Sequence, residues 1–171
     1  MSTFASPHFD EYRKGHPARE SNPRTGEPAD ALENKSPHPE ISSLTEAPTT
    51  VTVSGSWTDE ATKHLWLIGT DDVRVALEHG ELGKSCGRGK LAHTNLFGNI
   101  PAHSGGELWF RGSEHIWLNG GSGRYPARSP EELEASVDGF REAGYKVCCF
   151  GWDNVRKAPA RVLLEGAEGW K

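Results

Sequence analysis

Hydrophobic and polar positions alternate most regularly in two short segments, residues 107–110 and 115–119, with the turn Arg111-Gly112-Ser113-Glu114 between them. This period of two predicts a β-hairpin. One face of the hairpin would carry only apolar side chains, those of Leu108, Phe110, Ile116 and Leu118. The other face would carry both aromatic and polar side chains, those of Glu107, Trp109, His115, Trp117 and Asn119. We expect the apolar face to be core and the mixed face to form the wall of a ligand pocket.

Apolar positions at helical spacing predict two helices. The stronger signal lies at 129–144, where Ser129-Pro130-Glu131-Glu132 supplies an N-cap, a first-turn proline and a capping-box glutamate, and a glycine ends the helix. The weaker signal runs from Thr70 to Gly80. Strands are expected at 64–68, 146–150 and 161–164. This order of elements predicts an α+β fold with a mainly antiparallel sheet and two helices.

Residues 1–50 differ in composition from the rest of the chain. They hold seven of the eleven prolines and few aliphatic residues, with no helical or strand period. Such a segment buries too little apolar surface to offset the entropy lost on ordering. We therefore predict a disordered tail over 1–50 and one globular domain over 51–171. The tail could be a tether, a segment that binds a protein partner or a leader for delivery, or it could be a solvated segment without a catalytic role, and composition leaves these alternatives open.

Charge and composition narrow the class of protein. The chain has a net charge of −5 and three cysteines, two of them adjacent at Cys148-Cys149. No apolar run approaches the roughly 18–20 residues that a membrane helix needs, and the first residues lack the pattern of a signal peptide. An odd number of cysteines with an adjacent pair favours reduced thiols. We expect no membrane contact and a cytoplasmic location, or secretion by a route other than the general secretory pathway.

The stretch 82–128 is basic, unlike the chain as a whole. It contains half of the twenty glycines, and six Lys and Arg residues against Glu107 and Glu114, which gives it a net charge of about +4. Glycine lets the backbone approach a ligand closely, and a guanidinium group binds phosphate or carboxylate in a bidentate manner. An anionic ligand such as RNA or a nucleotide is therefore expected here.

Three motifs in this stretch carry candidate chemistry. His93 can exchange a proton near neutral pH, Glu107 can act as a general base, and the loop Ser122-Gly123-Arg124-Tyr125 combines a cation with backbone N–H groups that can bind an anion. The expected catalytic residues are His93, Glu107, Arg124 and Tyr125. The expected ligand-binding residues are Thr94, Asn95, Trp109, Trp117, Asn119, Ser122 and Gly123. Structural alternatives stay open: a histidine bonded to the backbone, an exposed strand glutamate, and a wide turn with its arginine in solvent.

We expect no metal and no cofactor. A zinc site would have to draw on Cys86, His93, His103 and His115, but the chain has neither C-x-x-C nor H-x-x-x-H spacing. The glycine-rich loops match neither the phosphate-loop pattern G-x-x-x-x-G-K-[ST] nor the dinucleotide pattern G-x-G-x-x-G.

The segment from His93 to about Tyr145 resembles a domain found in bacterial polymorphic-toxin-like proteins and in plant IQ-motif calmodulin-binding proteins. In that family a His-Ser-Ser segment leads to an Ala-Gly-Glu-type strand and then to Ser-Gly-His-Tyr, a proline and a helix. The corresponding residues here are His93-Thr94-Asn95, Gly105-Gly106-Glu107, Ser122-Gly123-Arg124-Tyr125 and Ser129-Pro130-Glu131. Arg124 stands where the family has histidine, which removes one imidazole from a two-histidine mechanism. The resemblance implies a site at these residues and a role in toxicity or defence, without implying a particular reaction.

Three functions fit these observations. The first is a metal-independent phosphodiesterase or nuclease acting on RNA or on a small, including a cyclic, nucleotide, with Trp109 and Trp117 stacking a base. The second is an ADP-ribosyltransferase-like enzyme that uses NAD through His93, Tyr125 and Glu165. The third is a non-catalytic module that binds a ligand or a protein. The spacing of the motifs predicts that five residues converge on one cleft walled by the hairpin: His93, Glu107, Ser122, Arg124 and Tyr125.

Overall fold

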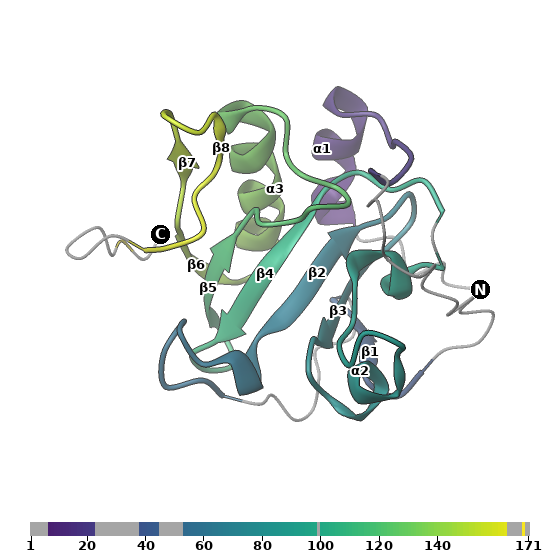
Figure 1. Cartoon of the computed structure of the whole chain (residues 1–171). Coiled ribbons are helices and arrows are strands. Elements are labelled where there is room, and N and C mark those ends of the chain that lie inside the picture. The colour runs from purple at the N-terminus through teal and green to yellow at the C-terminus, as the bar shows by residue number, and fades with distance from the viewer. Residues whose placement is uncertain (1–6, 23–37, 45–52, 99, 164–168, 170–171) are drawn as a thin grey trace.

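The computed structural model of the chain describes residues 7–22, 38–44, 53–98, 100–163 and 169. Its centre is a six-stranded sheet with the strand order β1-β3-β2-β4-β5-β6 (Figure 1). The strands are β1 (Ile41–Ser43), β2 (His64–Ile68), β3 (Val73–Leu77), β4 (Gly105–Phe110), β5 (His115–Asn119) and β6 (Lys146–Cys149). Neighbouring strands are antiparallel except β5 and β6, which are parallel. The expected α+β fold with a mainly antiparallel sheet is confirmed.

Helices pack on both faces of this sheet. The helices α1 (Asp10–Gly15) and α3 (Pro130–Glu142) share one face, and α2 (Glu81–Ser85) and the 3-10 helix η3 (His93–Leu96) lie on the other. The remaining elements are the 3-10 helices η1 (Pro7–Phe9) and η2 (Glu60–Thr62), and a small second sheet of β7 (Trp152–Asp153) and β8 (Ala158–Pro159). None of the helices within the described ranges has the length and apolar character to span a bilayer.

The expected hairpin is present as β4 and β5, and its two faces follow the alternation of the sequence. The apolar side chains all belong to one buried cluster with residues of α1 and α3: Leu108, Phe110, Ile116 and Leu118. On the opposite face Glu107 lies between Leu65 of β2 and Asn119 of β5. The polar side chains of the hairpin, Glu107 and Asn119, therefore lie near the middle of the sheet.

The longest helix, α3, begins and ends as its sequence predicts. The Ser129 hydroxyl accepts a hydrogen bond of 3.0 Å from the N–H of Glu132, and Pro130 occupies the first turn. The Glu132 carboxylate accepts from the N–H of Arg128 at 2.7 Å. Gly144 then takes a φ of +104°, a conformation that favours glycine. The helix lies in the connection between the parallel strands β5 and β6. Parallel neighbours cannot be joined by a tight turn, and they need a crossover long enough to hold such a helix.

The helix expected from Thr70 to Gly80 is wrong, because residues 73–77 form strand β3. Apolar residues in this short stretch fit a helical period, but Val73 and Val75 also share one face of a strand. The strand pairs with β1 on one side and with β2 on the other. A tight turn joins it to β2, with the N–H of Gly69 donating to the carbonyl of Asp72 at 2.8 Å. Hydrogen bonding to a strand on each edge stabilises the extended conformation of residues 73–77 more than their weak helical pattern stabilises a helix.

Two stretches of the expected disordered tail, 7–22 and 38–44, are instead folded against the domain. Phe9 and Tyr12 are fully buried in the main core cluster, and Phe9 packs edge-on to Phe140 of α3. The second stretch contains edge strand β1. Average composition over fifty residues concealed these few well-placed aromatic and aliphatic side chains. The other residues of 1–50 lie outside the described residues.

At the C-terminal end one expected strand is present and another is not. Strand β6 confirms the strand expected at 146–150. Residues 161–163 form no strand, and Leu164 lies outside the described residues. The strand that pairs with β7 in this part of the chain is β8, at residues 158–159, and not the expected strand at 161–164. Proline at 159 suits the short edge strand found there.

Candidate functional site

A polar cavity of about 180 Å³ opens on the sheet face that carries Glu107. Four of the expected site residues line it: His93, Glu107, Gly123 and Arg124. Residues that were not expected also line it with charged side chains: Lys63, Glu78, Arg88, Lys90 and Arg161. Five basic side chains thus face two carboxylates, so the lining has a net charge of about +3 with a neutral histidine. Three of these cations, Arg88, Lys90 and Arg124, come from the basic stretch 82–128, and the other two come from outside it.

His93 enters the cavity from the start of η3. The side chain of Asn95 accepts a hydrogen bond of 2.8 Å from the N–H of Ala92, which fixes this turn. The imidazole is buried, and its Nε2 lies 2.8 Å from the carbonyl of Gly106. A Cβ at Gly105 would lie 2.8 Å from His93 Cδ2, so glycine at this position makes room for the ring.

Burial controls the protonation of His93. Loss of hydration lowers the pKa of the imidazole to about 4, against the smaller opposing effects of the Gly106 hydrogen bond and the charges of Glu107 and Glu78. The ring is therefore neutral at physiological pH. Since Nε2 faces a carbonyl, it carries the proton, and Nδ1 has the lone pair that can accept one.

Glu107 is held in place by a buried amide. Asn119 Nδ2 donates to Glu107 Oε1 at 3.1 Å, while Asn119 Oδ1 accepts from the N–H groups of Glu107 and Gly121 at 3.1 and 2.8 Å. Asn119 is completely buried. It does not line the cavity as an expected ligand-binding residue would, and instead connects the carboxylate to the loop that follows β5.

A second group of charges forms around Lys63, just before β2. Its Nζ lies 2.7 Å from Oε2 of both Glu60 and Glu78 and 3.0 Å from Oε2 of Glu107. Burial by itself would lower the pKa of Lys63, but the hydrogen bonds to the three carboxylates outweigh it and raise the pKa. The lysine therefore remains an ammonium group and fixes the carboxylates on the cavity wall.

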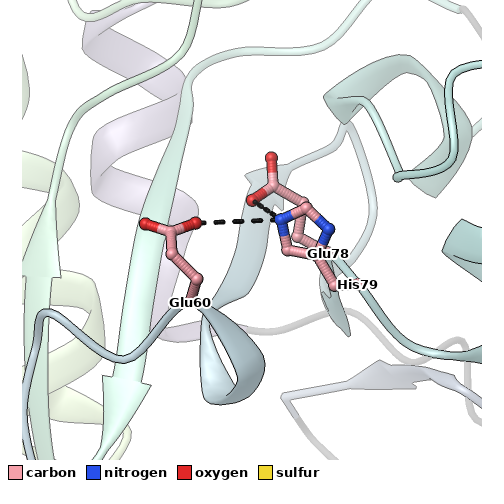
Figure 2. Close-up of side chains that lie close together, drawn as sticks. All are labelled: Glu60, Glu78 and His79. Atoms are coloured by element: carbon pink, nitrogen blue, oxygen red, sulfur yellow. Dashed lines mark ion pairs between the residues drawn. The ribbon is translucent and has the colours of Figure 1, made fainter.

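Figure 2 shows the neighbouring cluster of Glu60, Glu78 and His79. Within the described part of the chain, this is the one group of three side chains close enough to ligate a metal ion. His79 Nε2 lies 3.3 Å from Glu78 Oε2 and 3.7 Å from Glu60 Oε2. The same two oxygens already contact Lys63, whose charge occupies the place of a cation. The cluster is best understood as an ion-pair network.

The basic residues reach the cavity from three separate loops. Arg124 comes from the loop after β5, in which the Ser122 hydroxyl accepts from the N–H of Tyr125 at 2.9 Å. Arg88 and Lys90 come from the glycine-rich loop after α2. Arg161 comes from the C-terminal segment, and its Cζ would lie 3.3 Å from a Cβ at Gly121. Guanidinium and ammonium groups converging from several loops are typical of an anion site.

Other expected site residues lie away from this cavity. Tyr125 is buried among apolar residues, and its hydroxyl donates to the carbonyl of Ile100 at 3.0 Å. Ser122, Thr94 and Asn95 are also buried and do not belong to the lining. Their roles are local: Ser122 and Asn95 fix the turns that carry Arg124 and His93.

Trp109 and Trp117 share the face of Glu107 but are covered. They pack in a cluster with Cys148 and Leu163, and Trp109 stacks on Phe150 at a centroid distance of 5.9 Å. Trp109 Nε1 donates to the carbonyl of Asp59 at 3.1 Å. Alternation identified the face correctly, but it could not show that later segments of the chain would cover these rings.

Sequence reasoning missed Lys63, Glu78 and Arg161. Lys63 directly precedes β2 and Glu78 directly follows β3, so they are neighbours across an antiparallel pair. Recognition of the β2–β3 hairpin would have brought these two opposite charges together. Arg161 carries no local signal, because only the return of the C-terminal segment places it over the cavity.

The three cysteines are free thiols, as expected. Within the described ranges, the side chains that a zinc site would need form no group of three possible ligands: Cys86, His93, His103 and His115. His103, for example, bonds through Nδ1 to the carbonyl of His16.

A comparison of the chain with known protein families, with curated proteins and with solved structures finds no match.

Proposed function

We propose that this protein is a metal-independent phosphodiesterase that acts at this cavity on a small nucleotide or on a short end of RNA. The observation that carries the proposal is the convergence of His93, Glu107 and Arg124 in one cationic cavity. They come from η3, from β4 and from the loop after β5. A neutral imidazole beside a cluster of fixed cations suits a reaction in which a hydroxyl attacks a phosphate.

The buried imidazole is the proposed acid–base group. His93 takes the proton of the attacking hydroxyl or water through Nδ1, and the resulting imidazolium returns it to the leaving oxygen. Its low pKa of about 4 makes the imidazolium a strong proton donor and the neutral imidazole a weak base, so the ring favours proton transfer to the leaving oxygen over proton removal from the attacking group. Arg124, Arg88 and Arg161 face the negative charge that grows on the phosphorane. The phenol of Tyr125 has no part in this scheme, because it donates to a backbone carbonyl.

The size and lining of the cavity favour a small substrate. A volume of about 180 Å³ is below the roughly 300–1,000 Å³ typical of sites that enclose drug-sized ligands. Among the described residues, the lining includes no Trp, Tyr or Phe on which a base could stack. The net charge of −5 disfavours long polyanions. The cavity therefore suits a phosphate group with little attached to it, or with the rest of the ligand outside.

A second candidate is a binding module without catalysis. Glu107 is engaged by Lys63 and by Asn119, and His93 Nε2 is engaged by Gly106, so the polar groups of the wall are already paired. Such a wall can bind an anion without transferring protons. The NAD-dependent alternative would use His93, Tyr125 and Glu165. Of these, Glu165 lies outside the described residues and Tyr125 does not line the cavity, so it has less support.

The test is cleavage of labelled RNA and of short and cyclic oligonucleotides in the presence of a chelator. The variants are His93→Gln, in which the amide nitrogen can still donate to Gly106, and Arg124→Ala. Arg156→Ala is the matched control, since this exposed arginine lies on the β7–β8 turn, outside the lining. We expect rate losses of about 10²–10⁴-fold for His93→Gln and about 10²–10³-fold for Arg124→Ala, with wild-type cleavage by the control.

The other outcomes separate the two candidates. If wild type cleaves nothing but binds pyrophosphate, and Arg124→Ala abolishes that binding, the phosphodiesterase proposal is wrong and the binding module is supported. If wild type neither cleaves nor binds, both candidates fail.

A further inference from the structure

The N-terminal part of the chain supports two of the three segments that bring cations to the cavity. Residues 19–22 lie beside the loop that carries Arg124, and Glu40 contacts α2, which leads into the loop that carries Arg88 and Lys90. The two contacts are independent of each other, because they come from the separate stretches 7–22 and 38–44.

The first contact is made to the backbone around Arg124. The N–H of Asn22 donates to the carbonyl of Arg124 at 2.8 Å, and Arg124 Nη1 donates back to the carbonyl of Asn22 at 3.4 Å. The guanidinium of Arg19 donates to the carbonyl of Pro126, two residues further on. Arg19 is itself fixed to Ala102 by two backbone hydrogen bonds of 2.8 and 3.0 Å. The main chain of the Arg124 loop is thus held from outside by residues 19–22.

This stretch is anchored deep in the domain. The Tyr12 hydroxyl lies 2.7 Å from Ser104 Oγ and donates to Glu132 Oε1 at 2.8 Å, both in buried surroundings. Phe9 packs against Gly139 of α3, where a Cβ would overlap its ring. Because both aromatic side chains are buried in the core, residues 19–22 are attached to a rigid base.

The second contact is made to the start of α2. Glu40 accepts hydrogen bonds from the N–H groups of Glu81 and Leu82 through its two carboxylate oxygens, 2.9 Å in the first case. The residue that precedes the helix, Gly80, has no side chain to do this. Strand β1 follows Glu40 directly and pairs with β3. A residue far away in sequence therefore caps the helix that precedes Arg88 and Lys90.

We infer that residues 7–22 and 38–44 form a clamp that positions the cationic loops for the anion, with Arg19 and Glu40 as its positioning residues. The inference rests on the proposed function for the identity of its ligand, a phosphate group. Neither side chain lines the cavity. Their effect is exerted through the loop backbones, whose displacement moves several cations at once.

The experiment measures binding of inorganic pyrophosphate by isothermal titration calorimetry to the full chain and to Arg19→Ala, Glu40→Ala and Arg19→Lys. The matched control is Val147→Ala, which removes core contacts from β6, outside both the clamp and the cavity lining. We expect Arg19→Ala and Glu40→Ala to weaken binding about tenfold each, since small displacements of binding groups are costly. Arg19→Lys should restore most of the affinity, and Val147→Ala should retain it despite a lower melting temperature.

Hydrogen exchange of the amides tests the clamp without any ligand. We expect faster exchange at 121–126 in Arg19→Ala and at 81–90 in Glu40→Ala, each confined to its own loop. If Val147→Ala weakens pyrophosphate binding as much as Arg19→Ala does, or if exchange rises over the whole domain alike, the clamp is wrong. If wild type binds no pyrophosphate, the proposed function is wrong. The clamp is then still tested by hydrogen exchange, because faster exchange confined to one loop supports it without any ligand.

Discussion

Lys63 shows how one residue can determine the charge pattern of a site. It is 8 % exposed and contacts three carboxylates from η2, from the residue after β3 and from β4. A buried ion pair adds little stability compared with an apolar pair, but removal of one partner leaves uncompensated buried charge. Lys63 therefore stabilises the site by placing a positive charge beside the carboxylates of Glu78 and Glu107. The arginines in the lining then contribute to the excess of positive charge in the cavity.

Substitution of this lysine should be strongly destabilising. Lys63→Met keeps the length and apolar stem of the side chain but leaves the carboxylates of Glu78 and Glu107 without their ammonium partner. We expect a loss of about 3–5 kcal/mol in the free energy of unfolding, measured by denaturant titration. Lys14→Met is the control, because Lys14 makes an exposed ion pair with Glu11 and should show no measurable change. Equal effects of the two substitutions would contradict this account of Lys63.

At the scale of elements, close approach of strands and loops determines which glycines are required. Gly106 in β4 lies where a Cβ would overlap the backbone oxygen of Asn119 and come within 2.8 Å of Trp66 Nε1. The same indole nitrogen donates to the carbonyl of Asn119 at 3.1 Å. Backbone atoms cannot move aside as a flexible side chain can. Gly112, in the hairpin turn, has open space around it.

These two glycines in one hairpin form a matched pair for mutation. Gly106→Ala should disrupt the β4–β5 contact and destabilise the domain by about 3 kcal/mol or more, a cost in the range of strained or overpacked sites. Gly112→Ala should be neutral within about 1 kcal/mol, since it also restricts the unfolded chain. Thermal unfolding followed by circular dichroism measures both changes. A tolerated Gly106→Ala would mean that the Trp66–Asn119 contact is not close-packed.

At the scale of the whole molecule, burial of histidines makes stability depend on pH. His64 and His93 lie in different parts of the core, and burial lowers the pKa of each to about 4. In the unfolded chain a histidine has a pKa of about 6.5. Between these values the unfolded state binds more protons than the folded state. The stability is therefore fully present above about pH 6.5 and is lost as the pH falls toward about 4.

The expected pH dependence can be assigned to the two rings by substitution. Wild type should lose on the order of 3 kcal/mol for each histidine across this range, measured by denaturant titration at several pH values. His93→Gln and His64→Asn place an amide nitrogen near the ring nitrogen that faces a backbone carbonyl, Gly106 in the first case and Thr62 in the second. Each substitution should flatten the profile by about half. A profile unchanged in the double variant would show that other groups cause the acid sensitivity.

The sequence by itself determined the elements whose signals are local. The β4–β5 hairpin follows from period-two alternation, and the start of α3 follows from Ser129 and Pro130, because cap and turn preferences act over a few residues. The basic, glycine-rich stretch 82–128 also drew attention to residues that line the one cavity described above. Four of the expected site residues line this cavity: His93, Glu107, Gly123 and Arg124.

Only the tertiary structure decided the features that depend on contacts between distant segments. Strand β3 forms because β1 and β2 pair with its two edges, and residues 7–22 are ordered because Phe9 and Tyr12 reach the main core. The same holds for the ion pairs of Lys63, for the position of Arg161 and for the covering of Trp109. In each case the free energy comes from burial or charge pairing between residues far apart in the chain, which no local pattern contains.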